Sequence, residues 1–369
     1  MSKHLVSEHG IVCRLPGERL GYFGWPSVAR MDDGTLVVAS SGLRSEHICP
    51  WGKTVLNTSA DEGRTWSAPR VVSDTPLDDR DAGVVNLGGR RLLVTWFTSN
   101  TRQYAQEEWV RQWLGDAELA SWGPALEQMT DEAVARWLGS WVMRSDDGGE
   151  TWGAPARAPV SAPHGPIRLR SGALLYLGKP YGTWDDMSLA PITAAISHDA
   201  GDSWQTLGQV PVHPGADPAN YHEPHTIELP SGRLIGLIRV ETHSEKALPP
   251  DVTNFSIMQT ESNDGGHTWT PARPLGFHGS PPHGLRHSSG VLVLTYGYRQ
   301  PPFGQRVAFS HDDGATWDHD WILRDDGPDN DLGYPATVEL SDGSLFTVCY
   351  QKVAGDKKCS LLWSRWRLP

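Results

Sequence analysis

Apolar residues alternate with polar ones in short stretches on either side of a glycine, and this arrangement recurs six times along the chain. Alternation with a period of two is typical of a strand with one buried face, and a glycine between two such strands supplies the turn of a hairpin. The pattern therefore predicts six β-hairpins. They span residues 25–38, 81–94, 165–175, 223–235, 282–293 and 334–346.

A second repeat of eight residues, which we call the box, lies in phase with the hairpins. Its pattern is Ser-x-Asp-x-Gly-x-Thr/Ser-Trp, and its five copies occupy residues 59–66, 145–152, 197–204, 262–269 and 310–317. An aspartate side chain can accept hydrogen bonds from backbone N–H groups two residues on, glycine supplies a positive φ, and the final Trp can begin the next strand. We interpret the boxes as turns and expect their aspartates to be structural rather than catalytic.

Hairpins and boxes together predict a closed ring of sheets, because one blade of a β-propeller takes about 40–50 residues. The sixth unit lacks a box near residues 360–366, whereas the N-terminal stretch from Leu5 to Leu15 is strand-like and has no partner. We predict that this stretch supplies the outer strand of the sixth blade and removes the open edge. The expected fold is an all-β, six-bladed β-propeller that forms one domain over residues 1–369.

One segment, about residues 101–141, breaks the repeat and is predicted to be a helical insertion. Two tryptophan pairs have helical i,i+4 spacing, and Thr130 precedes a helix-forming stretch as an N-cap. The pairs are Trp109 with Trp113 and Trp137 with Trp141. The insertion either packs as a helical hairpin on the side of the propeller, or acts as a lid over a pocket or a contact in a homo-oligomer.

Composition narrows the class of partner. The net charge of −12 argues against nucleic acid or an anionic membrane surface as a partner. There is no apolar run of membrane-spanning length, the N-terminus is too polar for a signal peptide, and the four cysteines show neither metal-ligand spacing nor a disulfide framework. We therefore expect a cytoplasmic protein without a metal or other cofactor. Of the 17 tryptophans, 12 lie outside the boxes, and aromatic faces suit a carbohydrate partner.

The innermost strands of a propeller begin around one mouth of its central channel, so their first residues are neighbours in space. Here these positions hold ionisable and aromatic residues where a purely structural strand would favour valine or isoleucine. We take this convergence as the candidate site. Its members are Trp25, Arg80, Asp81, His164, Glu223, His225, His283 and Tyr334.

The box repeats, together with three further residues, resemble those of bacterial sialidases over nearly the whole chain apart from the insertion. These residues are Tyr334 within residues 332–340, Glu223 in the sequence His222-Glu-Pro-His225, and Arg239 sixteen positions later. The resemblance implies a sialidase-like propeller and a retaining exo-glycosidase. It implies that Tyr334 is the nucleophile and Glu223 its base, because a phenol needs an adjacent base to attack. It further implies that Arg239 binds a substrate carboxylate.

The chain departs from the family pattern at two places. The first carboxylate-binding arginine of that family falls where this chain reads Phe23-Gly-Trp25-Pro26, so it is missing, and Trp25 is expected to stack on a sugar ring instead. The third arginine is either Arg299 or Arg306. The acid/base aspartate of that family is missing from the loop after the first hairpin. The candidates for its role are Glu46 and His47 in that loop and Asp81 in the second blade, and we favour Asp81 because it begins an inner strand beside Arg80. Arg44, in the loop that carries His47, is a further substrate-binding candidate.

Two other functions stay open. A polysaccharide or oligosaccharide lyase on the same scaffold would use tyrosine and histidine as acid and base, and it is motivated by His164, His222, His225 and His283. These histidines could also hold a divalent metal, although their spacing matches no recognised ligand motif. A carbohydrate-binding propeller without catalysis is the third hypothesis, because a fold does not fix a function.

Overall fold

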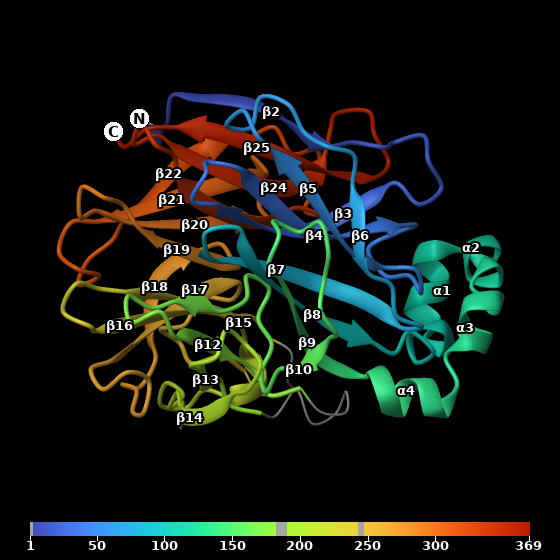
Figure 1. Ribbon diagram of the computed structural model, residues 1–369, viewed down its shortest axis with the longest axis horizontal. Helices are drawn as coiled ribbons and strands as arrows, with labels where there is room; N and C mark the ends of the chain where they lie inside the picture. Colours follow the sequence, from blue (N-terminus) through green and yellow to red (C-terminus); the bar gives the residue numbers. More distant parts are fainter. Residues whose placement is uncertain (1–2, 182–189, 243–246) are drawn as a thin grey trace.

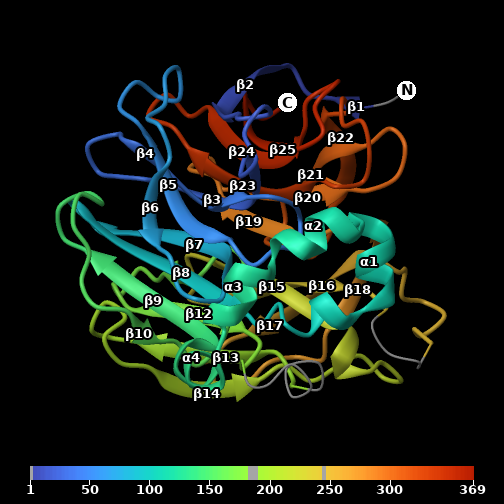
Figure 2. The same ribbon diagram turned by 90° about the vertical axis from the view of Figure 1, so that its right-hand side faces the viewer.

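The computed structural model describes residues 3–181, 190–242 and 247–369. Within these residues the strands form six sheets around a common centre, which confirms the predicted six-bladed β-propeller (Figures 1 and 2). In each blade the chain enters at the innermost strand and proceeds outward through antiparallel neighbours. This order brings the starts of the six inner strands together at the face turned toward the viewer in Figure 2.

The blades are numbered here in chain order from the first complete sheet. Blade 1 contains β3 (Tyr22–Arg30), β4 (Leu36–Arg44), β5 (Lys53–Ser59) and β6 (Arg70–Ser73). Blade 2 contains β7 (Asp78–Gly88), β8 (Arg91–Ser99), β9 (Gly139–Ser145) and β10 (Ala156–Arg157). Blade 3 contains β11 (Ile167–Arg168), β12 (Leu174–Gly178), β13 (Thr193–Ser197) and β14 (Gln205–Gln209).

The remaining three blades follow the same plan. Blade 4 contains β15 (Tyr221–Glu228), β16 (Leu234–Val240), β17 (Ser256–Ser262) and β18 (Arg273–His278), and the 3₁₀ turn η2 (Pro218–Asn220) precedes it. Blade 5 contains β19 (Pro282–Arg286), β20 (Leu292–Tyr298), β21 (Gly304–Ser310) and β22 (Asp318–Arg324), with β1 (Lys3–His4) at its edge. Blade 6 contains β23 (Gly333–Glu339), β24 (Leu345–Lys352), β25 (Cys359–Trp366) and β2 (Ser7–Cys13).

The N-terminal segment closes the ring as predicted. Strand β2 pairs antiparallel with β25, and Ser7 lies opposite Trp366. The two residues of β1 were not foreseen as a separate strand, and they pair in parallel with β22 of blade 5. One short segment therefore ties blades 5 and 6 together, and it covers the outer edge that the C-terminal strand would otherwise leave open.

The hydrophobic core lies between the blades. Each large apolar cluster combines residues from two neighbouring sheets, as expected when twisted sheets pack face to face around a ring. Between blades 6 and 1, for example, Val38 and Val55 lie in one cluster with Phe346 and Val348. Trp25 and Tyr334 belong to the same cluster, so two candidate site residues are held by core packing.

The boxes are turns, but their hydrogen bonds span more residues than predicted. In the first box Asp61 accepts from the backbone N–H of Thr65 at 2.9 Å and from its hydroxyl at 2.6 Å, four residues on rather than two. Ser59 Oγ accepts from the N–H of Gly63 at 2.9 Å. The other four boxes repeat these contacts. The hydrogen bonds lower the pKa of Asp61 to about 2, which suits a structural role.

The glycine of each box also sets the contact with the preceding blade. Gly63 has φ +87°, and a Cβ there would lie 2.3 Å from the ring of Phe346 in blade 6. Gly314 likewise has φ +87°, and a Cβ would lie 2.7 Å from Ile235 in blade 4. A side chain at either position would force the facing residue of the preceding blade to shift, so the glycine permits close packing of the blades as well as the turn.

The insertion between β8 and β9 forms four short helices in the described chain, rather than one hairpin. They are α1 (Glu108–Leu114), α2 (Asp116–Ser121), α3 (Gly123–Gln128) and α4 (Asp131–Trp137), after the 3₁₀ turn η1 (Tyr104–Gln106). Gly115 and the Gly123-Pro124 pair separate the helices. The prediction that Trp137 and Trp141 lie on one helix is wrong, because α4 ends at Trp137 and Trp141 belongs to β9. The predicted cap is confirmed, because Thr130 Oγ1 accepts from the N–H of Ala133 at 3.2 Å.

The insertion lies on the face of the propeller where the inner strands begin (Figure 2). Val110 and Trp122 are buried against Ile48 and Cys49 in the loop after β4. Among the described residues, no helix is both long and apolar enough to cross a bilayer.

Candidate active site

A cavity of about 430 Å³ opens at the mouth where the inner strands begin. Its wall contains Trp25 from blade 1, Asp81 from blade 2, Glu223 from blade 4 and Tyr334 from blade 6, so the predicted convergence is real for these four residues. The wall also contains five further predicted residues. They are His47, Arg80, His222, Arg239 and Arg299.

A larger hollow of about 640 Å³ lies near the chain termini, far from this convergence. Its charged side chains pair with one another, as Arg365 does with Glu62 and Asp342. We therefore place the candidate site in the smaller cavity, where groups from different blades face a common space.

The four inner-strand residues share an unusual backbone conformation. The φ angles of Trp25, Asp81, Glu223 and Tyr334 are +53°, +51°, +48° and +51°, a region that residues with a Cβ rarely adopt. Each lies where the register of the inner strand shifts against the second strand. A bulge of this kind re-aims a side chain, and strain repeated at four equivalent positions of one cavity is typical of a functional site.

Tyr334, Glu223 and Arg239 form one hydrogen-bonded group. The Tyr334 hydroxyl donates to Glu223 Oε1 at 2.5 Å, and Arg239 Nη1 donates to Glu223 Oε2 at 2.6 Å and to the Tyr334 oxygen at 3.1 Å. Arg239 lies on β16 opposite His222, beside the bulge that carries Glu223. The phenol oxygen thus has a carboxylate to receive its proton and a guanidinium beside it.

Tyr334 is protonated in the resting site. Burial raises the pKa of its hydroxyl well above the ordinary value, and the charge of Glu223 raises that pKa further, while Arg239 acts in the opposite direction. An uncharged phenol can approach an anionic ligand without like-charge repulsion. It becomes a strong nucleophile only as its proton passes to Glu223.

Two arginines form a cationic wall on one side of the cavity. The guanidinium groups of Arg239 and Arg299 lie 5.1 and 5.0 Å from the ring centre of Phe255. Glu241 pairs with Arg239, and Arg299 Nε donates to the carbonyl of Leu332 at 3.0 Å, so both cations are held in place. Planar guanidinium groups fixed in this way suit recognition of a carboxylate.

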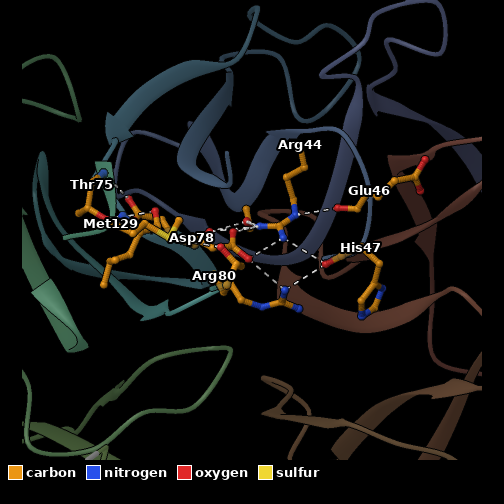
Figure 3. Close-up of polar contacts among 11 residues, drawn as sticks. Arg44, Glu46, His47, Thr75, Asp78, Arg80 and Met129 are labelled. Atoms are coloured by element: carbon orange, nitrogen blue, oxygen red, sulfur yellow. Dashed lines mark hydrogen bonds and ion pairs between the residues drawn. The ribbon is translucent and has the colours of Figure 1, made fainter. Parts of the chain in front are cut away.

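A third cation, Arg80, lies over Trp25 in the cavity wall. The Arg80 guanidinium is 4.2 Å from the Trp25 ring centre, and its Nη1 donates to the carbonyl of His47 at 3.0 Å. Arg44 lies close to Arg80, fully buried, and forms a two-pronged ion pair with Asp78 at 2.5 and 2.9 Å (Figure 3). Arg44 therefore supports Arg80 through Asp78 and the His47 loop through the His47 carbonyl, and does not itself line the cavity.

Asp81 has the properties of an acid/base. Burial raises the pKa of its carboxyl to about 7, the nearby charge of Glu223 acts in the same direction, and Arg80 opposes them. A carboxyl group with a pKa near neutrality can both donate and accept a proton. Glu46, the other acidic candidate, does not line the cavity.

His47 lines the cavity and is held by a network behind it. Its Nδ1 lies 3.0 Å from Asp331 Oδ1 and 3.0 Å from the Tyr22 hydroxyl, which itself donates to Asp331. Burial lowers the pKa of His47, and the hydrogen bond from its ring to Asp331 counteracts this in part. The ring stands edge-on to Trp25 at 4.9 Å between centroids. This network was not predicted, because Asp331 belongs to no repeat.

Three of the predicted histidines, His164, His225 and His283, lie behind the cavity, deeper in the channel. The rings of His225 and His283 stack at 4.2 Å, and His164 meets both edge-on. Burial lowers the pKa of all three, that of His225 to about 4, so they are neutral. These three histidines line a separate hollow of the channel. Three of the four histidines that motivated a lyase therefore do not reach the candidate site.

The hydrogen bonds of two buried histidines also disfavour metal binding. Nδ1 of His225 accepts the N–H of Gly284 at 3.1 Å, and Nδ1 of His283 accepts the N–H of Thr337 at 3.3 Å. In neutral rings this places the proton on Nε2, which then has no lone pair to offer. Across residues 3–181, 190–242 and 247–369, no group of three or more His, Cys, Asp or Glu residues is arranged to hold a metal ion.

Arg306 lies outside the cavity. It belongs to β21, the third strand of blade 5, and its guanidinium stacks 4.5 Å from the Tyr298 ring while Nη1 donates to the carbonyl of Arg324. Of the two arginines proposed for the third carboxylate contact, only Arg299 lines the site.

The structure adds residues that sequence reasoning missed. Phe97 and Ser99 end β8, Tyr104 comes from η1 of the insertion, and Lys179 follows β12. Burial lowers the pKa of Lys179 to about 8, against a weaker opposite effect of Asp217. The missed residues lie near the end of a second strand or after it, and the hairpin pattern gave no reason to single out those positions.

Comparison with known proteins gives a family for the sequence and relatives for the fold. The sequence profile of the family described as "BNR repeat-like domain" matches residues 122–347, more than half of the chain. No curated protein sequence matches the chain.

Solved structures show the same fold. A protein of unknown function from Dyadobacter fermentans is 22% identical with a TM-score of 0.75, and the match covers 100% of both chains. The Hadza microbial sialidase Hz136 is 16% identical with a TM-score of 0.66, covering 98% of this chain and 68% of the sialidase. The α-L-arabinanase of Penicillium chrysogenum is 13% identical with a TM-score of 0.59, covering 98% and 97%.

Proposed function

This chain belongs to the BNR repeat-like domain family of sialidase-like β-propellers, and from that premise we propose that it is a retaining glycoside hydrolase that removes a terminal, negatively charged sugar. The observation that carries the proposal is the hydrogen-bonded group of Tyr334, Glu223 and Arg239 in the wall of the central cavity. A buried phenol joined to a carboxylate at 2.5 Å is prepared for nucleophilic attack, and a structural tyrosine does not need such a base.

In the first step the Tyr334 oxygen attacks the anomeric carbon while its proton passes to Glu223. The bond from that carbon to the leaving oxygen breaks, and neutral Asp81 gives its proton to this oxygen. In the second step Asp81, now a carboxylate, takes a proton from water as the water oxygen attacks the anomeric carbon. The bond to Tyr334 breaks, and the phenol recovers its proton from Glu223.

Three guanidinium groups in the wall support an anionic substrate. Arg239 and Arg299 flank Phe255 near the nucleophile, and Arg80 lies over Trp25 on the other side. A carboxylate of the sugar is proposed to contact Arg239 and Arg299, and the Trp25 side is proposed to receive the ring.

The test is turnover of chromogenic sialosides, uronides and neutral glycosides by the wild type and by Tyr334→Phe. We expect turnover of at least one acidic glycoside, and a loss of at least about a hundredfold in Tyr334→Phe without a change in melting temperature. Tyr350→Phe is the matched control, because Tyr350 packs 5.9 Å from Tyr334 and contacts Arg299 without touching Glu223. It should stay within a few-fold of the wild type.

A second measurement identifies the intermediate. A fluorinated substrate analogue with a good leaving group slows breakdown of the glycosyl-enzyme, so digestion and mass spectrometry should find the sugar on the peptide that contains Tyr334. Full activity of Tyr334→Phe, or an adduct on another residue, would reject the assignment. Products with a new ultraviolet absorbance would indicate elimination. Sugar binding without turnover of any glycoside would indicate a binding module.

A further inference from the structure

Two tryptophans on helix α1 are exposed beside the candidate site. The side chains of Trp109 and Trp113 have relative exposures of 50% and 47%, whereas Val110 on the same helix is fully buried. Residues four apart lie on the same face of a helix, so the two indole rings belong to one surface. Large aromatic side chains are seldom left exposed together without a binding partner.

This surface is continuous with the cavity. Tyr104 lines the cavity wall, and its ring meets Trp109 edge-on with 6.2 Å between centroids. Trp113 follows one helical turn further, so Tyr104, Trp109 and Trp113 form a row of aromatic residues that leads from the cavity onto the insertion. We call this row the aromatic path. The helices lie on the mouth face of the propeller in Figure 2.

The aromatic path is anchored rather than loose. Val110 and Trp122 are buried with Ile48 and Cys49 of the loop after β4. Arg19 donates to the hydroxyl of Ser121 at 3.0 Å. A rigid aromatic surface can bind a ligand at a low cost in conformational entropy, because the rings are already in place.

We propose that Trp109 and Trp113 bind the neutral sugar units on the leaving-group side of the cleaved bond, so that the protein acts on the ends of oligosaccharides. This inference rests on the proposed glycosidase function. A cavity of about 430 Å³ lies toward the lower end of small-molecule sites and suits one terminal sugar. The sugar units that follow the terminal sugar must extend out through the mouth. The aromatic path supplies faces on which their rings stack through C–H groups.

A second copy of the chain is a less suitable partner for the surface of Trp109 and Trp113. Two half-exposed indoles offer an area on the order of 200 Å², well below the roughly 800 Å² per partner of a stable protein interface. The neighbouring exposed residues of the helix are polar, with Glu107, Glu108 and Arg111 among them. A small aromatic surface in polar surroundings suits a sugar better than a large apolar protein face.

The first experiment compares substrate lengths. For the Trp109→Ala, Trp113→Ala double variant, we expect kcat/KM for a chromogenic monosaccharide glycoside to stay within twofold of the wild type. For a tetrasaccharide ending in the same sugar, kcat/KM should fall about tenfold. The Trp109→Phe, Trp113→Phe variant should restore most of this loss, because phenylalanine keeps a stacking face. Val71→Ala, an exposed apolar position in blade 1, is the unaffected control. Equal losses on both substrates would overturn the proposal.

The second experiment does not depend on turnover. Protein labelled with 5-fluorotryptophan is titrated with three neutral tetrasaccharides, namely lacto-N-tetraose, xylotetraose and arabinotetraose, and followed by fluorine NMR. The Trp109 and Trp113 signals are identified with the single variants Trp109→Phe and Trp113→Phe. At least one tetrasaccharide should shift these signals, in the wild type and in Tyr334→Phe alike. If none does, the proposal is overturned even if hydrolysis is observed. If these signals respond but no glycoside is cleaved, only the proposed function fails. The proposal for Trp109 and Trp113 would also be overturned if the wild type formed a dimer and the Trp109→Ala, Trp113→Ala variant did not.

Discussion

The Tyr334 hydroxyl donates a 2.5 Å hydrogen bond to Oε1 of Glu223, although the two residues lie 111 positions apart and in different blades. Both residues have positive φ angles, so the contact depends on two strained backbone bulges that face each other across the mouth. Each such residue carries strain of about 1–3 kcal/mol. This strain persists only where the surrounding packing holds the backbone in place. The packing between blades 6 and 1, which includes Tyr334 itself, supplies part of that constraint.

Glu223→Gln tests the base. The amide can still accept the hydrogen bond from Tyr334, but it cannot take the proton, so kcat should fall roughly 10²–10⁴-fold on the substrate found in the glycoside panel. Arg239 retains Glu241 as a partner, and we therefore expect the variant to fold. Glu228→Gln, further along the same strand, should leave the rate unchanged, because Glu228 accepts from the backbone N–H of Arg170 at 2.7 Å and does not line the cavity. A Glu223→Gln enzyme with the wild-type rate would remove Glu223 from the mechanism.

Asp81→Asn should make the protein more stable and less active. The pKa of Asp81 is about 7 in the folded protein and near 3.9 in an unfolded chain. Between these values the folded state binds the extra proton, so stability falls as pH rises from about 4 to about 7. The Asp81→Asn variant lacks this loss. Its melting temperature should therefore exceed that of the wild type by a margin that grows from about pH 4 to about pH 7 and then levels off.

The rate effect of Asp81→Asn should depend on the leaving group. A 4-nitrophenol leaving group needs little protonation, so its release should suffer far less than that of a sugar. Asp312→Asn is the control for the stability profile, because hydrogen bonds to the Thr316 side chain and backbone lower the Asp312 pKa to about 2. That carboxylate stabilises the fold above about pH 4, so its replacement should cost a constant amount from pH 5 to 8. A flat profile for Asp81→Asn would show that Asp81 ionises normally.

The sequence predicted the ring because its signals are local. A glycine turn between alternating strands identifies each hairpin, and the lone strand-like segment near Leu5 had only the sixth blade to complete. The same reasoning brought Trp25, Asp81, Glu223 and Tyr334 together, because topology alone gathers inner-strand starts. The structure confirmed this gathering of the four residues, whereas their catalytic roles stay proposals.

Strand periodicity could not separate the residues that line the cavity from those behind it. Glu223 and His225 are two apart and would share a face in a regular strand, but the register shift between His222 and His225 sends them to different spaces. Arg306 shows a second limit, since its distance from the mouth follows from its place on the third strand of a blade. The His47 network likewise depends on Asp331, whose loop carries no periodic signal.

Asp331→Asn should lower the pKa of His47 further. Burial already lowers it, and the Asp331 carboxylate is the main group that raises it, by hydrogen bond and by charge, whereas Arg80 and Arg299 act in the lowering direction. Replacement of the carboxylate by a neutral amide leaves the opposing cations uncompensated. The measurement is an NMR titration of the His47 ring, assigned with His47→Gln.

The matched control for this titration is Asp325→Asn, an exposed position in the same loop that should leave the His47 titration unchanged. An upward shift in Asp331→Asn would mean that the hydrogen bond between His47 and Asp331 does not form in solution.

The buried ion pair of Arg44 and Asp78 gives the strongest stability prediction. Both side chains have no exposure, and the pair holds Arg80 and the His47 loop in place. Asp78→Ala leaves the Arg44 charge buried without its partner, and we expect a loss of about 3–5 kcal/mol in unfolding free energy, measured by urea denaturation. The apolar pair Arg44→Met, Asp78→Leu should lose less, because no buried charge remains. If the double variant were as unstable as Asp78→Ala, the loss would come from packing rather than from the unpaired charge.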